Sequence, residues 1–191
     1  MNIIGLSGNV KRPSRTASLV EAIITAVGSR FVVEGRTIEL ADAAPILFKA
    51  LRSDQLDAEG RAIEAADILV VGSPVYRASY TGALKHLFDL VDYRALTGKR
   101  VILAATGGTP LHGLMAEHQL RPLFGFFNAL SLPTAIYATE VDFTEYVITN
   151  LAVHERIERA VSELAQVLPV SDQTAAARAH GNRPALVAAP A

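Results

Sequence analysis

Residues that suit the binding of a phosphate group follow the first apolar run of the sequence. The loop at residues 7–18 reads SGNVKRPSRTAS, and it combines basic side chains with hydroxyl groups directly before a stretch of helical period. The first turn of a helix has free backbone N–H groups and the positive end of the helix dipole, which favour an anion. The loop therefore suits a phosphate monoester. It equally suits an ordinary capped turn, in which Ser14 or Thr16 is the N-cap and the charges are solvated.

A second loop suits a planar ligand. Residues 73–80 read SPVYRASY and come directly after a continuous apolar run. Pro74 lacks an N–H group and fixes the backbone as the chain leaves that run. The ring of Tyr76 can then pack on a flat group while backbone amides meet its edge. The alternative is a turn with a half-buried tyrosine.

A third loop lets the backbone come close to a ligand. Residues 105–113 read ATGGTPLHG, and neither Gly107 nor Gly108 has a Cβ that would keep a ligand away. Their amides can donate to a carbonyl or to a developing anion. His112 follows, either as a ligand contact or as a hydrogen-bonding surface residue.

Several other chemistries find no support in the sequence. There is no G-x-x-x-x-G-K-[ST] motif, and Gly5 and Gly8 do not form G-x-G-x-x-G, which favours a single nucleotide over a dinucleotide on the first loop. The five histidines are scattered without a carboxylate cluster, so no metal site is expected. The absence of cysteine excludes thiolate catalysis, Fe–S clusters and disulfides.

Short apolar runs alternate with stretches of helical period along the chain. We expect strands at residues 2–7, 31–40, 67–73, 100–106 and 132–141, and helices at residues 18–27, 58–66, 80–93, 113–130 and 147–168. Residues 47–57 read as an irregular loop. This alternation predicts an α/β fold, a flavodoxin-like three-layer sandwich with a five-stranded parallel sheet of order 2-1-3-4-5. In such a sheet the ligand lies at the carboxyl ends of strands one, three and four.

Length and composition fit one domain that lacks unusual surface charge. The chain has 191 residues, 50% of them hydrophobic, and a net charge of −1. We expect a domain at residues 1–169 and a tail at residues 170–191 that is either disordered or a subunit-spanning arm. The near-neutral charge predicts no nucleic-acid partner. No apolar run reaches the ~18 residues of a membrane span, and the N-terminus lacks a secretory leader, so we expect a cytoplasmic protein.

The three loops together resemble the NAD(P)H-dependent FMN reductase family, which has a flavodoxin-like fold. The resemblance spans about residues 1–168 and is nearest to reductases that supply reduced FMN to alkanesulfonate and methanesulfonate monooxygenases. The segments that carry it are GLSGNVKRPSRTASLVEA, SPVYRASYTGALKHLFDL and GKRVILAATGGTPLHGLMAEHQLRPLF.

The resemblance assigns a role to each loop. The residues expected to hold the FMN phosphate are Ser7, Ser14, Arg15 and Thr16. Those expected to border the isoalloxazine are Pro74, Val75 and Tyr76. Those expected at its pyrimidine edge are Thr106, Gly107, Gly108 and Thr109.

The resemblance also implies a π-turn in the fourth helix, at a tetramer interface. That helix reads MAEHQLRPLF, and His118 stands where the alkanesulfonate-linked enzymes have tyrosine. This difference points to the methanesulfonate-linked branch, which is tetrameric and prefers NADH. His118 and His112 are therefore candidates for flavin exchange or for packing at a homo-oligomer interface.

The implied reaction moves a hydride from nicotinamide C4 to flavin N5 and needs no side-chain acid or base. NADH or NADPH is the reductant, and FMN is partly a substrate that leaves for a partner monooxygenase. Two other readings remain: a quinone or azo-dye reductase that keeps its FMN, and a flavodoxin-type electron carrier.

Overall fold

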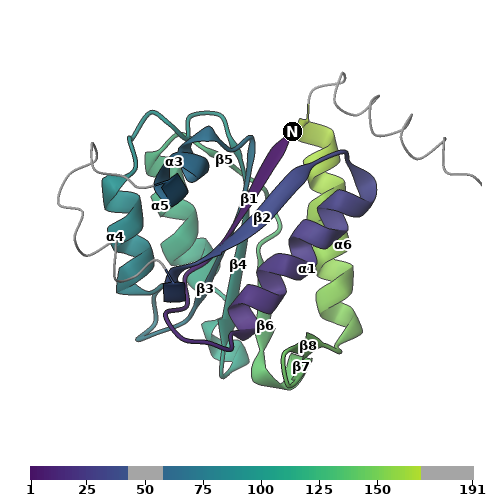
Figure 1. The fold of residues 1–191 in the computed structure, drawn as a ribbon. Coiled ribbons are helices and arrows are strands. Elements are labelled where there is room, and N and C mark those ends of the chain that lie inside the picture. Colours follow the sequence, from purple (N-terminus) through teal and green to yellow (C-terminus); the bar gives the residue numbers. More distant parts are fainter. Residues whose placement is uncertain (43–57, 169–191) are drawn as a thin grey trace, which may run out of the picture.

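The computed structural model describes residues 1–42 and 58–168 (Figure 1). The expected loop at residues 47–57 and the expected tail at residues 170–191 lie outside the described residues. Parallel strands form a central sheet: β1 (Asn2–Ser7), β2 (Glu34–Glu39), β3 (Ile68–Pro74), β4 (Arg100–Gly107), β5 (Leu130–Ser131) and β6 (Ile136–Thr139). The strand order is β2-β1-β3-β4-β5, and β6 also pairs with β4. The predicted order 2-1-3-4-5 is confirmed.

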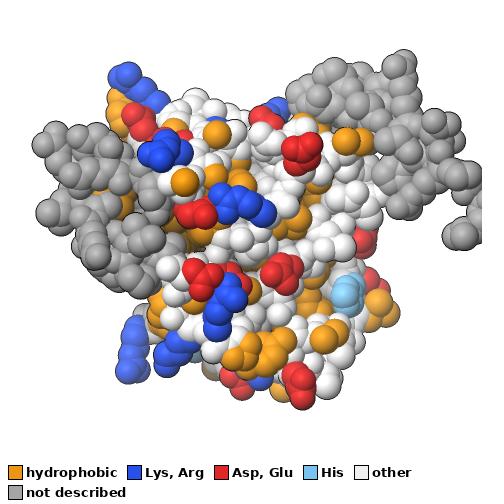
Figure 2. All heavy atoms as spheres, viewed as in Figure 1, with side chains coloured by type: hydrophobic (Ala, Val, Ile, Leu, Met, Phe, Trp, Pro, Cys, Tyr) orange, Lys and Arg blue, Asp and Glu red, His pale blue; other side chains and the backbone are white. Residues whose placement is uncertain are grey.

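Helices cover both faces of the sheet. They are α1 (Arg15–Arg30), α3 (Ala58–Ala65), α4 (Gly82–Leu90), α5 (Arg121–Phe126) and α6 (Leu151–Val167). Helices α1 and α6 lie on one face, and α3, α4 and α5 lie on the other (Figure 1). No helix in the described part of the chain is both long and apolar enough to cross a membrane. Basic and acidic side chains are interspersed over the face shown in Figure 2.

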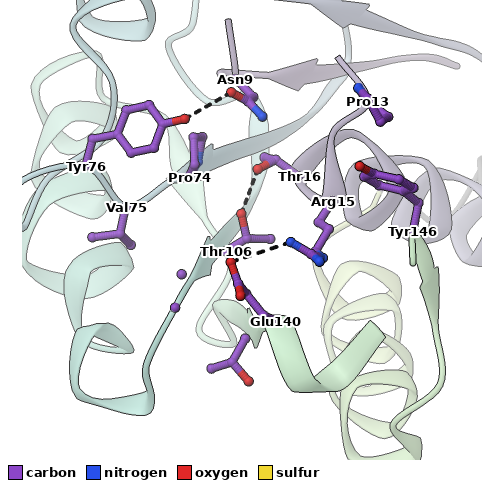
Figure 3. Close-up of a pocket in the computed structure, with 13 residues that line it drawn as sticks. Asn9, Pro13, Arg15, Thr16, Pro74, Val75, Tyr76, Thr106, Glu140 and Tyr146 are labelled. Atoms are coloured by element: carbon purple, nitrogen blue, oxygen red, sulfur yellow. Dashed lines mark hydrogen bonds and ion pairs between the residues drawn. The ribbon is translucent and has the colours of Figure 1, made fainter. Parts of the chain in front are cut away.

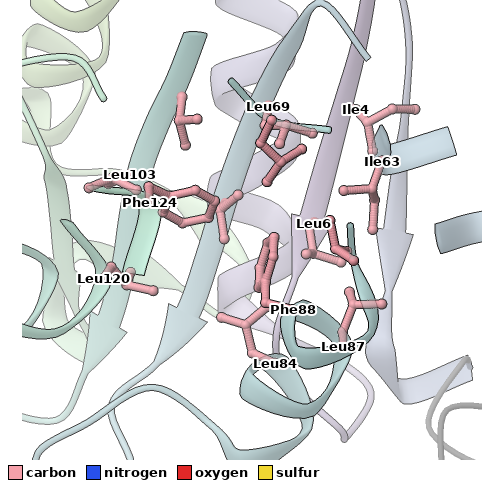
Figure 4. Packing of buried hydrophobic residues seen from close by; sticks show 14 of the residues in the cluster. Ile4, Leu6, Ile63, Leu69, Leu84, Leu87, Phe88, Leu103, Leu120 and Phe124 are labelled. Carbon is pink, nitrogen blue, oxygen red and sulfur yellow. The ribbon is translucent and has the colours of Figure 1, made fainter. Parts of the chain in front are cut away.

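The core consists of two layers because successive side chains of a strand point to opposite faces. Leu69 and Val71 of β3 belong to the layer under α3, α4 and α5 (Figure 4). Ile68 and Val70 belong to the layer under α1 and α6. Burial on both faces is the reason why β3 reads as a continuous apolar run rather than an alternating one.

The predicted strand at residues 132–141 was wrong as a single element. Within that range only β6 is a strand, and the two-residue strand β5 lies just before it; both pair with β4. Pro133 has no N–H to donate to the ladder. The N–H of Thr134 donates to Glu163 Oε2 at 2.8 Å, so the chain leaves the sheet between the two strands.

The first residues of two helices also differ from the prediction. Helix α1 begins at Arg15 rather than at residue 18, because Ser14 is its N-cap and accepts the N–H of Ala17. Helix α6 begins at Leu151 rather than at residue 147, and Asn150 caps it. A small antiparallel hairpin precedes α6, formed by β7 (Phe143–Thr144) and β8 (Val147–Ile148).

The fourth predicted helix, at residues 113–130, is irregular. A 3-10 turn, η2 (Pro110–His112), is followed by a π-helix, η3 (Ala116–Leu120), and then by α5. The N–H of Arg121 donates to the carbonyl of Ala116, five residues earlier, which is the bond of a π-helix. The expected π-turn in this helix is confirmed, and His118 lies within it, exposed to solvent.

We expect Phe124→Ala to lower the free energy of unfolding by about 3–5 kcal/mol. Phe124 is fully buried, and its ring packs edge-on against Phe88 with 5.0 Å between centroids. Urea unfolding of the variant measures the loss, and Leu151→Ala, at a residue 68% exposed, is the control. Equal midpoints for the two variants would contradict this packing.

Candidate functional site

The loops that follow β1, β3 and β4 meet around a cavity at the carboxyl edge of the sheet (Figure 3). Its volume is about 220 Å³. Eight of the residues expected at a site line it: Arg15, Thr16, Pro74, Val75, Tyr76, Thr106, Gly107 and Gly108. The topology therefore brings together the segments on which the sequence prediction rested.

The start of α1 presents an anion-binding end to this cavity. The hydroxyl of Ser14 accepts the N–H of Ala17 at 3.2 Å and the amide of Asn9 at 3.1 Å, so Ser14 is the N-cap. In the first turn of a helix the N–H groups of Arg15 and Thr16 have no acceptor within the helix. Both residues line the cavity, so the positive end of the helix dipole is directed toward it. The two interpretations of this loop therefore do not exclude each other, since the capped turn itself borders the cavity.

A buried hydrogen bond joins the first and third loops. The hydroxyls of Thr16 and Thr106 lie 2.7 Å apart, and both side chains are buried (Figure 3). Thr106 also accepts the N–H of Val75 through its carbonyl at 2.8 Å. The three loops are therefore held in one arrangement around the cavity by bonds that the protein makes with itself.

Tyr76 stands on a tight turn at the mouth of the cavity. Tyr76 and Ser79 exchange both backbone hydrogen bonds, at 2.9 and 3.1 Å. The turn between them places Arg77 and Ala78 at φ of 52° and 65°, a strained conformation for residues other than glycine. The ring of Tyr76 is 45% exposed, and its hydroxyl donates to Asn9 Oδ1 at 3.4 Å. The structure thus has the turn of the alternative interpretation, and it also places a partly exposed ring beside the cavity.

Gly107 is required by a neighbouring side chain. A Cβ at this position would lie 2.3 Å from the hydroxyl oxygen of Tyr137. That hydroxyl donates to the carbonyl of Thr109 at 2.6 Å, which fixes the loop after β4. Burial raises the pKa of Tyr137, so the phenol stays protonated and keeps this bond at neutral pH.

Arg15 is surrounded by residues that follow β6. Its Nε donates to the carbonyl of Glu145 at 3.2 Å, and its Nη1 lies 3.5 Å from Glu140 Oε1. Its guanidinium carbon lies 5.8 Å from the ring centroid of Tyr146. Glu140 and Tyr146 both line the cavity.

Sequence reasoning missed five lining residues: Asn9, Pro13, Thr139, Glu140 and Tyr146. The first two belong to the first loop, where attention went to the hydroxyl and basic residues. Of the other three, Thr139 ends β6, which pairs with the end of β4, Glu140 comes directly after it, and Tyr146 lies between β7 and β8. The rule that ligands bind at the carboxyl ends of strands applied to this strand too, and it could have identified them.

Asp142 fixes the chain after β6. Its carboxylate accepts the N–H and the hydroxyl of Thr139 at 2.6 and 2.8 Å, and the amide of Asn150 at 2.5 Å. Burial raises the pKa of Asp142, but these hydrogen bonds stabilise the carboxylate more strongly and hold the pKa below its ordinary value of 3.8.

Five predicted site residues do not line the cavity. Ser7 is fully buried, and its hydroxyl has no hydrogen-bond partner within the described structure. Ser14 is the buried cap of α1. Thr109 caps η2 by accepting the N–H of Leu111. His112 and His118 are exposed on η2 and η3, away from the cavity lining.

The sheet order and the site at its carboxyl edge define a nucleotide-binding α/β protein of flavodoxin-like architecture. A flavodoxin from the domain Archaea superposes with a TM-score of 0.58 at 13% identity, covering 87% of this chain and 99% of its own. That likeness supports the fold.

The sequence matches the family of NADPH-dependent FMN reductases over residues 1–144, and the chain belongs to this family. It is therefore an oxidoreductase that uses NAD(P)H and FMN. It is 48% identical over 167 residues to an FMN reductase (NADPH) of Pseudomonas aeruginosa, covering 85% of this chain and 90% of the relative. It is 47% identical over 169 residues to the NADH-dependent FMN reductase SfnF of Pseudomonas fluorescens, covering 86% and 90%. The apo structure of an NADH:FMN oxidoreductase superposes with a TM-score of 0.78 at 30% identity, covering 98% of this chain and 99% of its own.

We expect Asp142→Asn to destabilise the protein at pH 7 by about 1.5–3 kcal/mol, because the variant loses bonds to a charged acceptor. A carboxyl with a lowered pKa in the folded state contributes stability above its unfolded pKa and loses it on acidification. The difference between the two proteins should stay constant above about pH 5 and shrink as the pH falls through the pKa of Asp142. Urea unfolding at a series of pH values measures it. A constant difference down to acid pH would contradict the assignment.

Proposed function

We propose that this protein reduces FMN with NADH in preference to NADPH and releases the reduced flavin to a sulfonate monooxygenase. The observation that carries the proposal is the convergence of Arg15, Tyr76 and Gly107 on one cavity at the start of α1. Relatives of Pseudomonas at 47% and 43% identity are named NADH-dependent FMN reductases, SfnF and SfnE. Membership of the family identifies FMN as the flavin and NAD(P)H as the reductant. The names of these relatives support NADH as the nucleotide and a sulfonate monooxygenase as the partner.

The residues at the cavity fit FMN. A phosphate suits the guanidinium of Arg15 and the first-turn N–H groups of α1. Tyr76, together with Pro74 and Val75, would border one part of the ring system. Thr106, Gly107 and Gly108 would meet its pyrimidine edge. We assign Ser7, Ser14 and Thr109 to the wall behind the cavity, where they shape the loops that contact the ligand.

The chain's own part in the reaction is to hold and to orient. When bound, FMN accepts at N5 the hydride that nicotinamide C4 delivers. Tyr76 and Gly107, which both line the cavity, would set the position of the ring between them. The amides of Gly107 and Gly108 would donate to the pyrimidine edge, where negative charge gathers on reduction. This scheme requires no side-chain acid or base.

The size of the cavity agrees with a flavin that leaves. Pockets that enclose a ligand have volumes of about 300–1,000 Å³, whereas this cavity has about 220 Å³. A mononucleotide would keep part of its surface in solvent. A reductase that retains its FMN, such as a quinone or azo-dye reductase, is the second candidate, and a flavodoxin-type carrier is disfavoured by the near-neutral net charge of −1.

We further propose that the protein is a cytoplasmic homo-oligomer, either a dimer or a tetramer. Large apolar side chains lie exposed around the π-helix: Leu111, Leu114 and Phe126. His118 lies in the same stretch and would pack at the interface between subunits.

Oxidation of NADH and of NADPH, each with FMN, FAD and riboflavin, tests the proposal. We expect the highest kcat/KM with NADH and FMN, and we expect FMN to separate from the protein on a desalting column. Tight retention of FMN would favour the second candidate. A flavin that stays oxidised after rapid mixing with NADH but is reduced by NADPH would contradict the preference for NADH, and a flavin that neither nucleotide reduces would contradict any reductase.

We expect Arg15→Ala to weaken FMN binding by about 1.5–3 kcal/mol, roughly a 10- to 150-fold rise in Kd, because a charged hydrogen bond to the phosphate is lost. Riboflavin, which lacks the phosphate, should bind both forms equally. Arg12→Ala is the matched control, since Arg12 belongs to the same loop but pairs with Glu39 and Asp42, both at 2.7 Å. Flavin fluorescence titration gives the Kd values, and an unchanged FMN affinity in Arg15→Ala refutes the phosphate assignment.

A further inference from the structure

The guanidinium that would hold the phosphate already has an anion of its own chain beside it. Arg15 Nη1 lies 3.5 Å from Glu140 Oε1 (Figure 3), while its Nε is bound by the carbonyl of Glu145. The side chains of Arg15 and Glu140 are 38% and 67% exposed. The pair is therefore loose enough to open, and one face of the guanidinium is turned toward an acidic group when no ligand is present.

The backbone at Glu140 is fixed, although its side chain is exposed. Glu140 is the first residue of the 3-10 turn η4 (Glu140–Asp142). The buried carboxylate of Asp142 holds this turn through two bonds to Thr139, the residue before Glu140. The carboxylate of Glu140 is thus kept at the rim of the cavity rather than free to move away with a loop.

Charge in the cavity is balanced by these two side chains. Among the described residues that line it, Arg15 is the one cation and Glu140 is the one carboxylate. A phosphate bound at Arg15 must either separate the pair or lie beside a like charge. Both alternatives oppose binding, the first through a lost ion pair and the second through repulsion that is larger for a dianion.

We infer that Glu140 is an affinity-lowering residue: its carboxylate competes with the flavin phosphate for Arg15 and speeds the release of the flavin. The inference rests on the proposed function, because it takes the cavity to be the FMN site. Beyond that function, it assigns to Glu140 a role in setting the affinity for the phosphate of FMN. It also explains how a site with an arginine and a helix N-terminus can keep a dissociable ligand.

The competition acts on the phosphate alone. Riboflavin shares the ring system of FMN but carries no charge at this end, so it neither displaces Glu140 nor is repelled by it. Glu140 should therefore reduce the preference of the protein for FMN over riboflavin. Added salt should reduce the effect of Glu140, because both alternatives are electrostatic and lie at the solvent-exposed rim.

The test is the Kd of FMN and of riboflavin for Glu140→Gln. The substitution keeps the shape of the side chain and removes its charge, and the exposed position should leave the fold intact. We expect FMN to bind about three- to tenfold more tightly and to dissociate correspondingly more slowly, with riboflavin unchanged. In an Arg15→Ala background the same substitution should change the FMN Kd by less than about twofold, because the guanidinium that the two anions compete for is gone and only the screened repulsion between them remains.

Glu155→Gln is the matched control for the loss of one negative charge. Glu155 is exposed on α6 and borders a neighbouring cavity rather than this one, so its substitution should leave both affinities unchanged. The inference is overturned if Glu140→Gln binds FMN no more tightly than the unsubstituted protein. It is also overturned if Glu140→Gln lowers the Kd of riboflavin, or if Glu155→Gln lowers the Kd of FMN as much as Glu140→Gln does. If the unsubstituted protein itself fails to bind FMN at micromolar concentration, the proposed function is contradicted as well. If the unsubstituted protein binds FMN and Glu140→Gln leaves the Kd unchanged, this inference alone is overturned.

Discussion

The hydrogen bond between the hydroxyls of Thr16 and Thr106 is the contact on which the site depends. It joins the first turn of α1 to the end of β4, two segments that are 90 residues apart, and both groups are buried. A buried hydroxyl without a partner is costly, so each threonine requires the other. With this bond made, the N-terminus of α1 and the glycine loop after β4 face each other across the cavity. The proposed binding of FMN between these two segments depends on their being held in this position.

The sequence was sufficient for the order of the sheet and for the three loops, because both depend on local patterns. Buried parallel strands such as β3 require continuous apolar runs, and residues 68–74 are buried throughout. Loops at the carboxyl ends of neighbouring strands must meet, so the grouping of Arg15, Tyr76 and Gly107 followed from the strand order alone.

What could not be predicted depends on partners distant in sequence or on elements too short to show a period. Residues 132–141 look like one strand until the N–H of Thr134 is found to bond with Glu163, 29 residues later. The β7–β8 hairpin has two residues in each strand, too few for an alternating pattern. Because that hairpin escaped prediction, so did the place of Tyr146 beside Arg15. Ser14 was one of two predicted N-caps of α1, and the structure confirms it as the cap, whereas its role toward a phosphate stays a prediction.

A reductase that passes its flavin on has to bind the phosphate firmly enough to orient the ring and loosely enough to let it go. The cavity combines features that would raise the affinity for a phosphate with features that would lower it. In the proposed site the helix N-terminus and Arg15 would attract the phosphate, whereas the small volume and the neighbouring Glu140 would limit the affinity. The buried contacts that fix the site are the Thr16–Thr106 bond and the hydrogen bonds of the Asp142 carboxylate, whereas Arg15, Tyr76 and Glu140 are exposed enough to meet a ligand.

A crystal structure of the protein with FMN is the most direct test of where the flavin phosphate and the ring bind. The account predicts the phosphate within hydrogen-bonding distance of the Arg15 guanidinium and of the first N–H groups of α1, with the ring between Tyr76 and Gly107. A phosphate bound elsewhere, for example in the neighbouring cavity that Tyr137 and Arg156 line, would contradict it.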